Sequence, residues 1–118
     1  MIENLAVEKI KHECMDRLST KNLFTNHDEN TVEKLNELFK QKPLQKILNS
    51  EELLKSATVL LENNLNITSA SRMGYMHRNT LIYRIEKIKR LSGLDLRVFD
   101  EAVVFQNLVL IYNLINKK

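Results

Sequence analysis

Six basic side chains gathered in one short segment have the clearest chemistry in this sequence. Between Ile67 and Ser92 there are six arginines or lysines and a single acid, Glu86, so this segment carries +5 while the whole 118-residue chain carries +3. Such a segment suits contact with a polyanion such as nucleic acid. The alternative is a solvated helix face, but those faces usually interleave Glu to make i,i+4 pairs, and here only Glu86 could do so.

The same segment has the pattern of a helix-turn-helix unit, Asn66–Gly93. We predict a short helix over Ile67–Met73, a turn around Gly74, and a longer helix over Arg78–Leu91. Ala70 is small where the second helix must cross the first, and Gly74 stands where a positive φ is useful at a helix end. Many helix ends show this spacing, and the basic second helix is what strengthens the prediction.

On a helical wheel the longer helix separates into an apolar and a polar face. Leu81, Ile85 and Ile88 fall within about 60° of one another and are predicted to face the core. The opposite face is predicted to enter the DNA major groove. Contacts to base edges or the groove are assigned to Arg78, Asn79 and Tyr83. Phosphate contacts, which fix register without reading sequence, are assigned to Thr80, Arg84, Lys87 and Arg90. Two alternatives are open: Tyr83 packs on a neighbouring helix, or Arg90 serves as a charge at the helix C-terminus.

The composition favours an all-α chain, a small helical bundle that contains the helix-turn-helix unit. Two glycines and one proline are too few for a β-sandwich or barrel, and a hydrophobic fraction of 43% excludes a wholly disordered chain. No apolar run approaches the roughly 18 to 20 residues of a membrane span. The single Cys14 cannot form an internal disulfide, so we expect a reducing cytoplasm, with the protein at the nucleoid when DNA is bound.

Three helices are predicted ahead of this unit from apolar spacings of three and four. The first covers Ile2–Leu18, and a polar loop, Ser19–Asn30, follows it. The second covers Thr31–Lys40. The third begins either near Pro43 or at a Ser50 N-cap, and it stops at Asn63-Asn64, since Asn tolerates left-handed backbone angles.

A last helix is predicted from Asp100, as its N-cap, to Asn116, and its apolar residues cover more than one face. In a small domain this excess favours a subunit interface, and hence a homodimer matched to a palindromic DNA site. The alternative is that the first and third helices cover the excess within one monomer. The first helix is the other candidate for dimerisation.

Neither catalysis nor a metal or cofactor site is expected. His12 and Cys14 point about 200° apart on a helix, so they cannot share a metal, and His27 lies in a polar loop without a second His or Cys nearby. There is no glycine-rich phosphate loop and no Ser/His/Asp grouping. We therefore expect a protein that is not an enzyme.

Several short motifs follow one another in the second half of the chain. They are Leu53-Leu54, Asn63-Asn64, Asn66-Ile67, Ala70, His77-Arg78-Asn79-Thr80-Leu81, Tyr83-Arg84, Ile88 and Leu91-Ser92-Gly93-Leu94-Asp95-Leu96. On these motifs about 60 residues, Glu51 to Leu114, resemble the C-terminal domain of PucR/CdaR-type bacterial regulators. A more distant likeness to the DNA-binding end of the Fis protein covers the helix-turn-helix unit alone.

The resemblance implies a transcription factor that reads double-stranded DNA. It also implies which residues lie at the start of the recognition helix: His77, Arg78, Asn79, Thr80, Tyr83 and Arg84. We divide the chain into a helical extension, 1–45, for dimerisation or as the remnant of a sensory region, and a DNA-binding domain, 46–118. The alternative function is a helical protein-interaction or adaptor module that keeps the fold without binding DNA.

Overall fold

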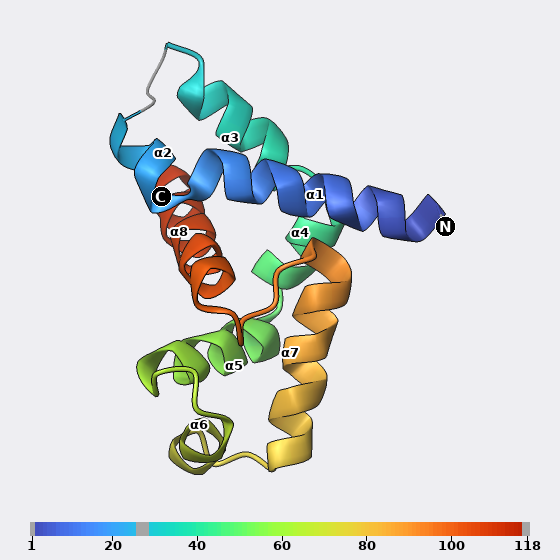
Figure 1. Ribbon diagram of the computed structural model, residues 1–118, viewed down its shortest axis with the longest axis vertical. Coiled ribbons are helices and arrows are strands. Elements are labelled where there is room, and N and C mark those ends of the chain that lie inside the picture. Colours follow the sequence, from blue (N-terminus) through green and yellow to red (C-terminus); the bar gives the residue numbers. More distant parts are fainter. Residues whose placement is uncertain (1, 26–28, 117–118) are drawn as a thin grey trace.

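The computed structural model describes residues 2–25 and 29–116, and over these ranges the chain is all-α, as the composition predicts. Eight helices and no strand are present in the described ranges (Figure 1). In chain order the helices are α1 (Ile2–Leu18), α2 (Thr20–Thr25), α3 (Thr31–Phe39), α4 (Lys42–Leu48), α5 (Glu51–Glu62), α6 (Ile67–Met73), α7 (Arg78–Ser92) and α8 (Phe99–Asn116).

The first half of the chain contains more helices than its sequence pattern predicts. The predicted loop after α1 holds the short helix α2, and the predicted third helix is in fact two, α4 and α5. Pro43 lies in the first turn of α4, where its fixed φ is favourable and its missing N–H costs nothing. Ser50 adopts extended angles and its side chain accepts a hydrogen bond from the Leu53 N–H at 3.2 Å. Both proposed starting points are therefore used, one by each helix.

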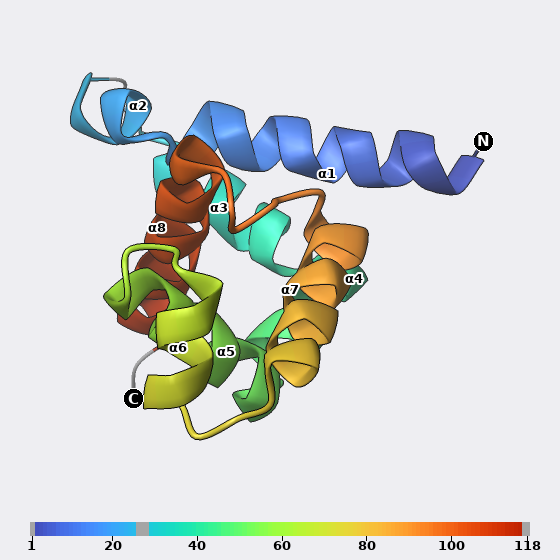
Figure 2. The ribbon, with the colours of Figure 1, turned by 60° about the horizontal axis from the view of Figure 1, so that its bottom comes forward.

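α1 lies across the ends of α7 and α8 and closes one end of the bundle (Figures 1 and 2). Its second half supplies Ile10, Cys14 and Leu18 to the core, all of them buried. Nearer the N-terminus the predicted apolar stripe is not covered, because Leu5 is 70% exposed. Only part of the predicted apolar face of α1 is therefore used inside the monomer.

α8 packs against α1 and α2, and the ring of Tyr112 meets Phe39 of α3 edge-on, with centroids 5.4 Å apart. The helix begins at Phe99, so Asp100 lies in its first turn and is not the N-cap that the sequence predicts. A carboxylate in the first turn still interacts favourably with the helix dipole. Part of the apolar excess stays uncovered: Leu110 is 55% exposed and Leu114 is 67% exposed.

One buried cluster of side chains includes residues from both sides of residue 45, among them Leu18, Leu38, Leu60 and Leu108. The division into an extension and a DNA-binding domain therefore stays a prediction. None of the helices in the described part of the chain combines the length and hydropathy that crossing a membrane requires.

Candidate nucleic-acid interface

α6 and α7 form the helix-turn-helix unit almost residue for residue as predicted, with α7 ending one residue later than expected. Each helix has a side-chain N-cap. The Asn66 side chain accepts from the Ser69 N–H at 2.8 Å, and Nδ1 of His77 accepts from the Asn79 N–H at 3.1 Å. These bonds satisfy N–H groups that have no partner within the helix, so they define where each helix starts. His77, predicted as a DNA-binding residue, is thus also the cap of α7.

The turn between the two helices departs from the prediction for Gly74. Gly74 has a φ of −88°, so it is not left-handed, and the positive φ belongs to the next residue, Tyr75, at 52°. Glycine is needed here for space. A Cβ on Gly74 would lie 3.0 Å from the Ala70 carbonyl oxygen and 3.2 Å from Cγ2 of Val59. Close contact between α5 and the end of α6 is what selects the small residue.

The buried face of α7 agrees with the helical wheel. Leu81, Ile85 and Ile88 are fully buried, and Ala70 is fully buried where α6 meets α7. The helix packs against α1, α4, α5 and α6, so it is supported along its whole length (Figure 2). A helix held in this way presents its other face in a fixed orientation.

The opposite face of α7 is exposed and polar. Asn79, Tyr83, Lys87 and Arg90 are all exposed, and Thr80 is half-buried at the flank. The Arg90 guanidinium carbon lies 5.7 Å from the centroid of the Tyr83 ring, within range of a cation–π contact. The Tyr83 ring therefore contacts a residue of its own helix, and it remains 57% exposed.

Two arginines assigned to DNA already have partners within the protein. Nη1 of Arg78 donates to Oγ1 of Thr68 on α6 at 3.0 Å, which links the two helices at the open end of the unit. Arg84 turns toward α5, where it lies 3.6 Å from a Glu52 carboxylate oxygen and 3.4 Å from Oγ of Ser56. Its side chain is only 22% exposed. Neither partner on α5 is foreseeable from sequence, since each lies about 30 residues away along the chain.

Hydrogen bonds and ion pairs between charged side chains hold the connection between α7 and α8, residues 93–98. Gly93 ends α7 with a left-handed φ of 81°. Partial burial would raise the pKa of Asp95, but hydrogen bonds from the Arg97 side chain and backbone, with the charges of Arg97 and Lys89, lower it overall. Hydrogen bonds to Asp95 and Glu86 in turn raise the pKa of Arg97. Arg97 is not among the residues for which the sequence predicts a role.

No group of three His, Cys, Asp or Glu side chains comes together as a metal site requires in the part of the chain that the structure describes. His12 is exposed and Cys14 is fully buried, in keeping with their opposite directions on α1. His27 lies outside the described residues. Burial, and secondarily the charge of Glu13, raise the pKa of the Cys14 thiol to about 12. This cysteine is therefore a core residue and has the properties of an unreactive thiol.

Comparison with known proteins places this geometry in a family. Residues 53–110 match the family described as the PucR C-terminal helix-turn-helix domain. The matched segment runs from α5 to the middle of α8, so it contains the whole unit and α5, one of the helices that pack against α7. No solved structure matches the chain.

Three relatives show the same likeness over part of their length. The chain is 33% identical over 76 residues to the uncharacterized protein YxkF of Bacillus subtilis, which is 64% of this chain and 26% of that protein. It is 40% identical over 47 residues to the purine catabolism regulatory protein of Bacillus subtilis, 40% of this chain and 9% of the relative. It is 33% identical over 70 residues to the carbohydrate diacid regulator of Escherichia coli, which is 58% of this chain and 18% of that protein. The chain therefore spans about a quarter or less of each of these relatives.

Proposed function

Since residues 53–110 belong to the PucR C-terminal helix-turn-helix family, we propose that this chain is a transcription regulator that binds double-stranded DNA in a sequence-specific manner. α7 enters the major groove. The observation that carries this proposal is the division of α7 into a fully buried apolar face and an exposed face with Asn79, Lys87 and Arg90. A helix supported from behind and exposed in front is the arrangement by which helix-turn-helix proteins read DNA.

The residues near the start of α7 are the ones that read bases. Asn79 is exposed in the first turn, and an Asn side chain can pair with adenine through two hydrogen bonds. Arg78 can pair with guanine once it leaves Thr68, a partner at an exposed position. Tyr83 lies one turn further along and contacts the groove through its exposed ring.

The remaining residues hold the phosphate backbone. Lys87 and Arg90 reach it from the exposed face, and Thr80 reaches it from the flank. Arg84 must exchange Glu52 and Ser56 for a phosphate, or it acts by holding α7 against α5. His77 contributes by capping α7. Its hydrogen bond from the Asn79 N–H fixes the first turn of the helix, which contains Asn79.

The protein acts as a homodimer in the cytoplasm and lies at the nucleoid when DNA is bound. Two-fold dimers suit sites whose halves are about 34 Å apart. The surface for the second copy is drawn from the apolar residues that the monomer leaves exposed, with Leu110 and Leu114 on α8 and Leu5 on α1 as candidates.

The test is selection of bound duplexes from a random library, with stoichiometry measured on the sequence recovered. Asn79→Ala should relax discrimination at one base pair by about 1–3 kcal/mol. Lys87→Ala should weaken binding to all sequences alike and lower the salt slope by about one. Lys21→Ala, which removes an exposed charge from α2, is the matched control and should change neither. A purified protein with no affinity for any duplex at low salt would refute the proposal and favour the adaptor module.

A further inference from the structure

Glu86 is the one acidic residue of α7, and it lies on the flank of the face proposed to meet DNA. It is three residues from Tyr83 and four from Arg90, so it shares their side of the helix. Its side chain is 41% exposed. A free carboxylate at this position would repel the phosphates that Lys87 and Arg90 are proposed to hold.

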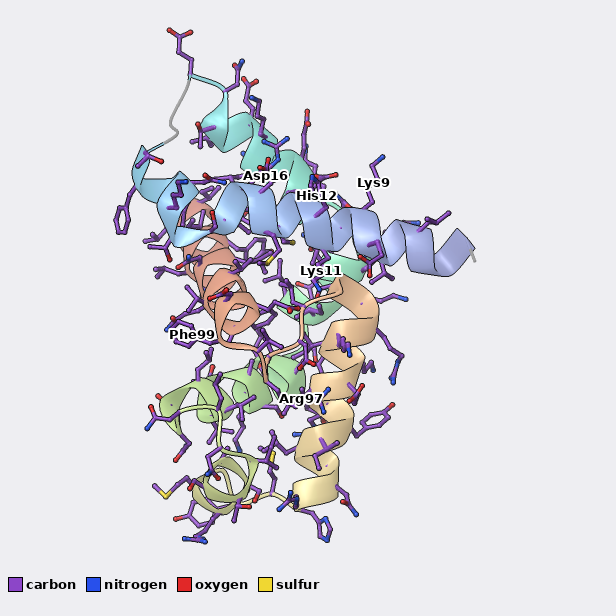
Figure 3. All side chains as sticks on the ribbon, viewed as in Figure 1. Lys9, Lys11, His12, Asp16, Arg97 and Phe99 are labelled. Atoms are coloured by element: carbon purple, nitrogen blue, oxygen red, sulfur yellow. The ribbon has the colours of Figure 1, made fainter. Side chains whose placement is uncertain are left out.

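Arg97 is positioned to remove this repulsion. It comes from the connection between α7 and α8, which Figure 3 shows folding back beside the middle of α7. Its Nη2 lies 2.6 Å from Oε1 of Glu86, and its Nε lies 2.9 Å from Oδ1 of Asp95. One guanidinium thus joins the carboxylate on α7 to a carboxylate of the connection.

The connection itself is held by further bonds, so the Arg97 backbone is fixed before its side chain reaches Glu86. The Arg97 N–H donates to Oδ1 of Asp95 at 3.0 Å. The Asp95 N–H donates to Oε1 of Glu101 at 2.9 Å, and that carboxylate pairs with Nζ of Lys11 at 3.4 Å. Figure 3 shows Lys11 beneath α1, where α1 crosses the end of α7. The chain of bonds runs from α1 to the exposed flank of α7.

We propose that Arg97 is a positioning residue for DNA binding, which holds the Glu86 carboxylate against the connection and cancels its charge at the exposed face of α7. This inference rests on the proposed function, since it concerns the same interface. Nζ of Lys89 also pairs with Asp95, at 3.7 Å. The carboxylates of Glu86 and Asp95 are therefore balanced by two bases, Arg97 and Lys89. The positive charge of Lys87 and Arg90 is then not offset.

A double-mutant cycle between Arg97→Gln and Glu86→Gln tests the proposal. The probe is a labelled duplex of about 30 base pairs, long enough for two half-sites, recovered by selection from a random library. We expect Arg97→Gln to weaken binding about fivefold at low salt, as one uncovered charge near several phosphates implies. In the Glu86→Gln background the same substitution should change affinity less than twofold, since the other carboxylate that Arg97 holds, Asp95, is still paired with Lys89. Lys21→Gln removes the same charge on distant α2 and should have no effect.

Each other outcome overturns the proposal. Equal losses in both backgrounds, with a salt slope lower by one, would mean that Arg97 binds phosphate directly. No loss in either background would mean that Glu86 does not affect binding.

The single variant Glu86→Gln leaves Arg97 unchanged, so it still tests the proposal if Arg97→Gln does not fold. A fivefold gain from it would show that the carboxylate is not covered in the native protein. If the wild-type protein binds no duplex, the proposed function fails and this inference fails with it. If it binds and the cycle shows no coupling, this inference alone fails.

Discussion

Lys11 of α1 lies directly against Gly93 at the end of α7. A Cβ atom on Gly93 would be 2.6 Å from Cβ of Lys11 and 3.1 Å from the carbonyl oxygen of Val7. Gly93 also has a φ of 81°, which side chains rarely adopt. The glycine that ends α7 therefore also determines how closely α1 can cross it.

Gly93→Ala should be much more destabilising than Gly74→Ala. The first substitution combines a left-handed φ with a collision against Cβ of Lys11 on α1, so we expect the free energy of unfolding to fall by about 2–4 kcal/mol. The second has an ordinary φ of −88° and a tight contact, and about 1 kcal/mol is expected. Urea unfolding followed by circular dichroism measures both free energies of unfolding. Equal losses would contradict the role given to α1.

His77→Ala should lower the free energy of unfolding by about 0.5–1 kcal/mol, because the Asn79 N–H at the start of α7 loses its capping partner. The matched control is His12→Ala, which removes an exposed imidazole from α1. Chemical unfolding of both variants tests the prediction. If the two variants are equally stable, the bond to Nδ1 contributes nothing.

Asp95 should make stability depend on pH in acid. Its pKa in the folded chain is lowered below the ordinary 3.8, so the carboxylate stabilises the folded state above that pH. This contribution is lost as the pH falls below 3.8 through the still lower folded value. The difference in stability between the wild-type protein and Asp95→Asn should therefore be constant near neutrality and shrink below about pH 4.

Asp16→Asn serves as the control for this measurement, since Asp16 is an exposed aspartate of α1. A difference for Asp95→Asn that grows as the pH falls would reverse the assigned sign.

The thiol of Cys14 should react with a disulfide reagent only when the chain unfolds. The side chain is fully buried, and its pKa of about 12 leaves almost no thiolate at pH 8. The rate in native buffer should be orders of magnitude below the rate in denaturant, and it should follow the population of unfolded chains. A native rate equal to that of a free cysteine would show that α1 opens from the bundle.

The predictions that succeeded came from signals contained within one element. The buried face of α7 follows from the spacing of Leu81, Ile85 and Ile88 alone, and the bounds of α6 follow from Asn66 and the turn. Within the helix-turn-helix unit, the error concerns a contact between elements. Gly74 was predicted from backbone angles, but its neighbour Val59 in α5 determines the choice of glycine.

The same reason explains why the partners of Arg84 and Arg97 within the protein could not be predicted from the sequence. The assignment of Arg84 to phosphate, made from its position on the wheel, stays a prediction, and its contact with Ser56 depends on how α5 crosses α7. Arg97 pairs with Glu86 only because the connection folds back along α7. A periodic pattern indicates which face of a helix is buried, but it does not give the partner of a long side chain at the edge of that face.

The exposed turn of the helix-turn-helix unit has a practical consequence for spectroscopy. The chain has three tyrosines and no tryptophan, so tyrosine is its main intrinsic fluorophore. Tyr75 is 96% exposed in the turn, and Tyr83 lies on the face of α7 proposed to meet DNA, while Tyr112 packs on Phe39 in the bundle. Quenching by a soluble anion such as iodide should therefore act mainly on the first two. An emission titration with duplex DNA would then follow binding without an attached dye, and the fraction that resists the quencher would report the folded bundle.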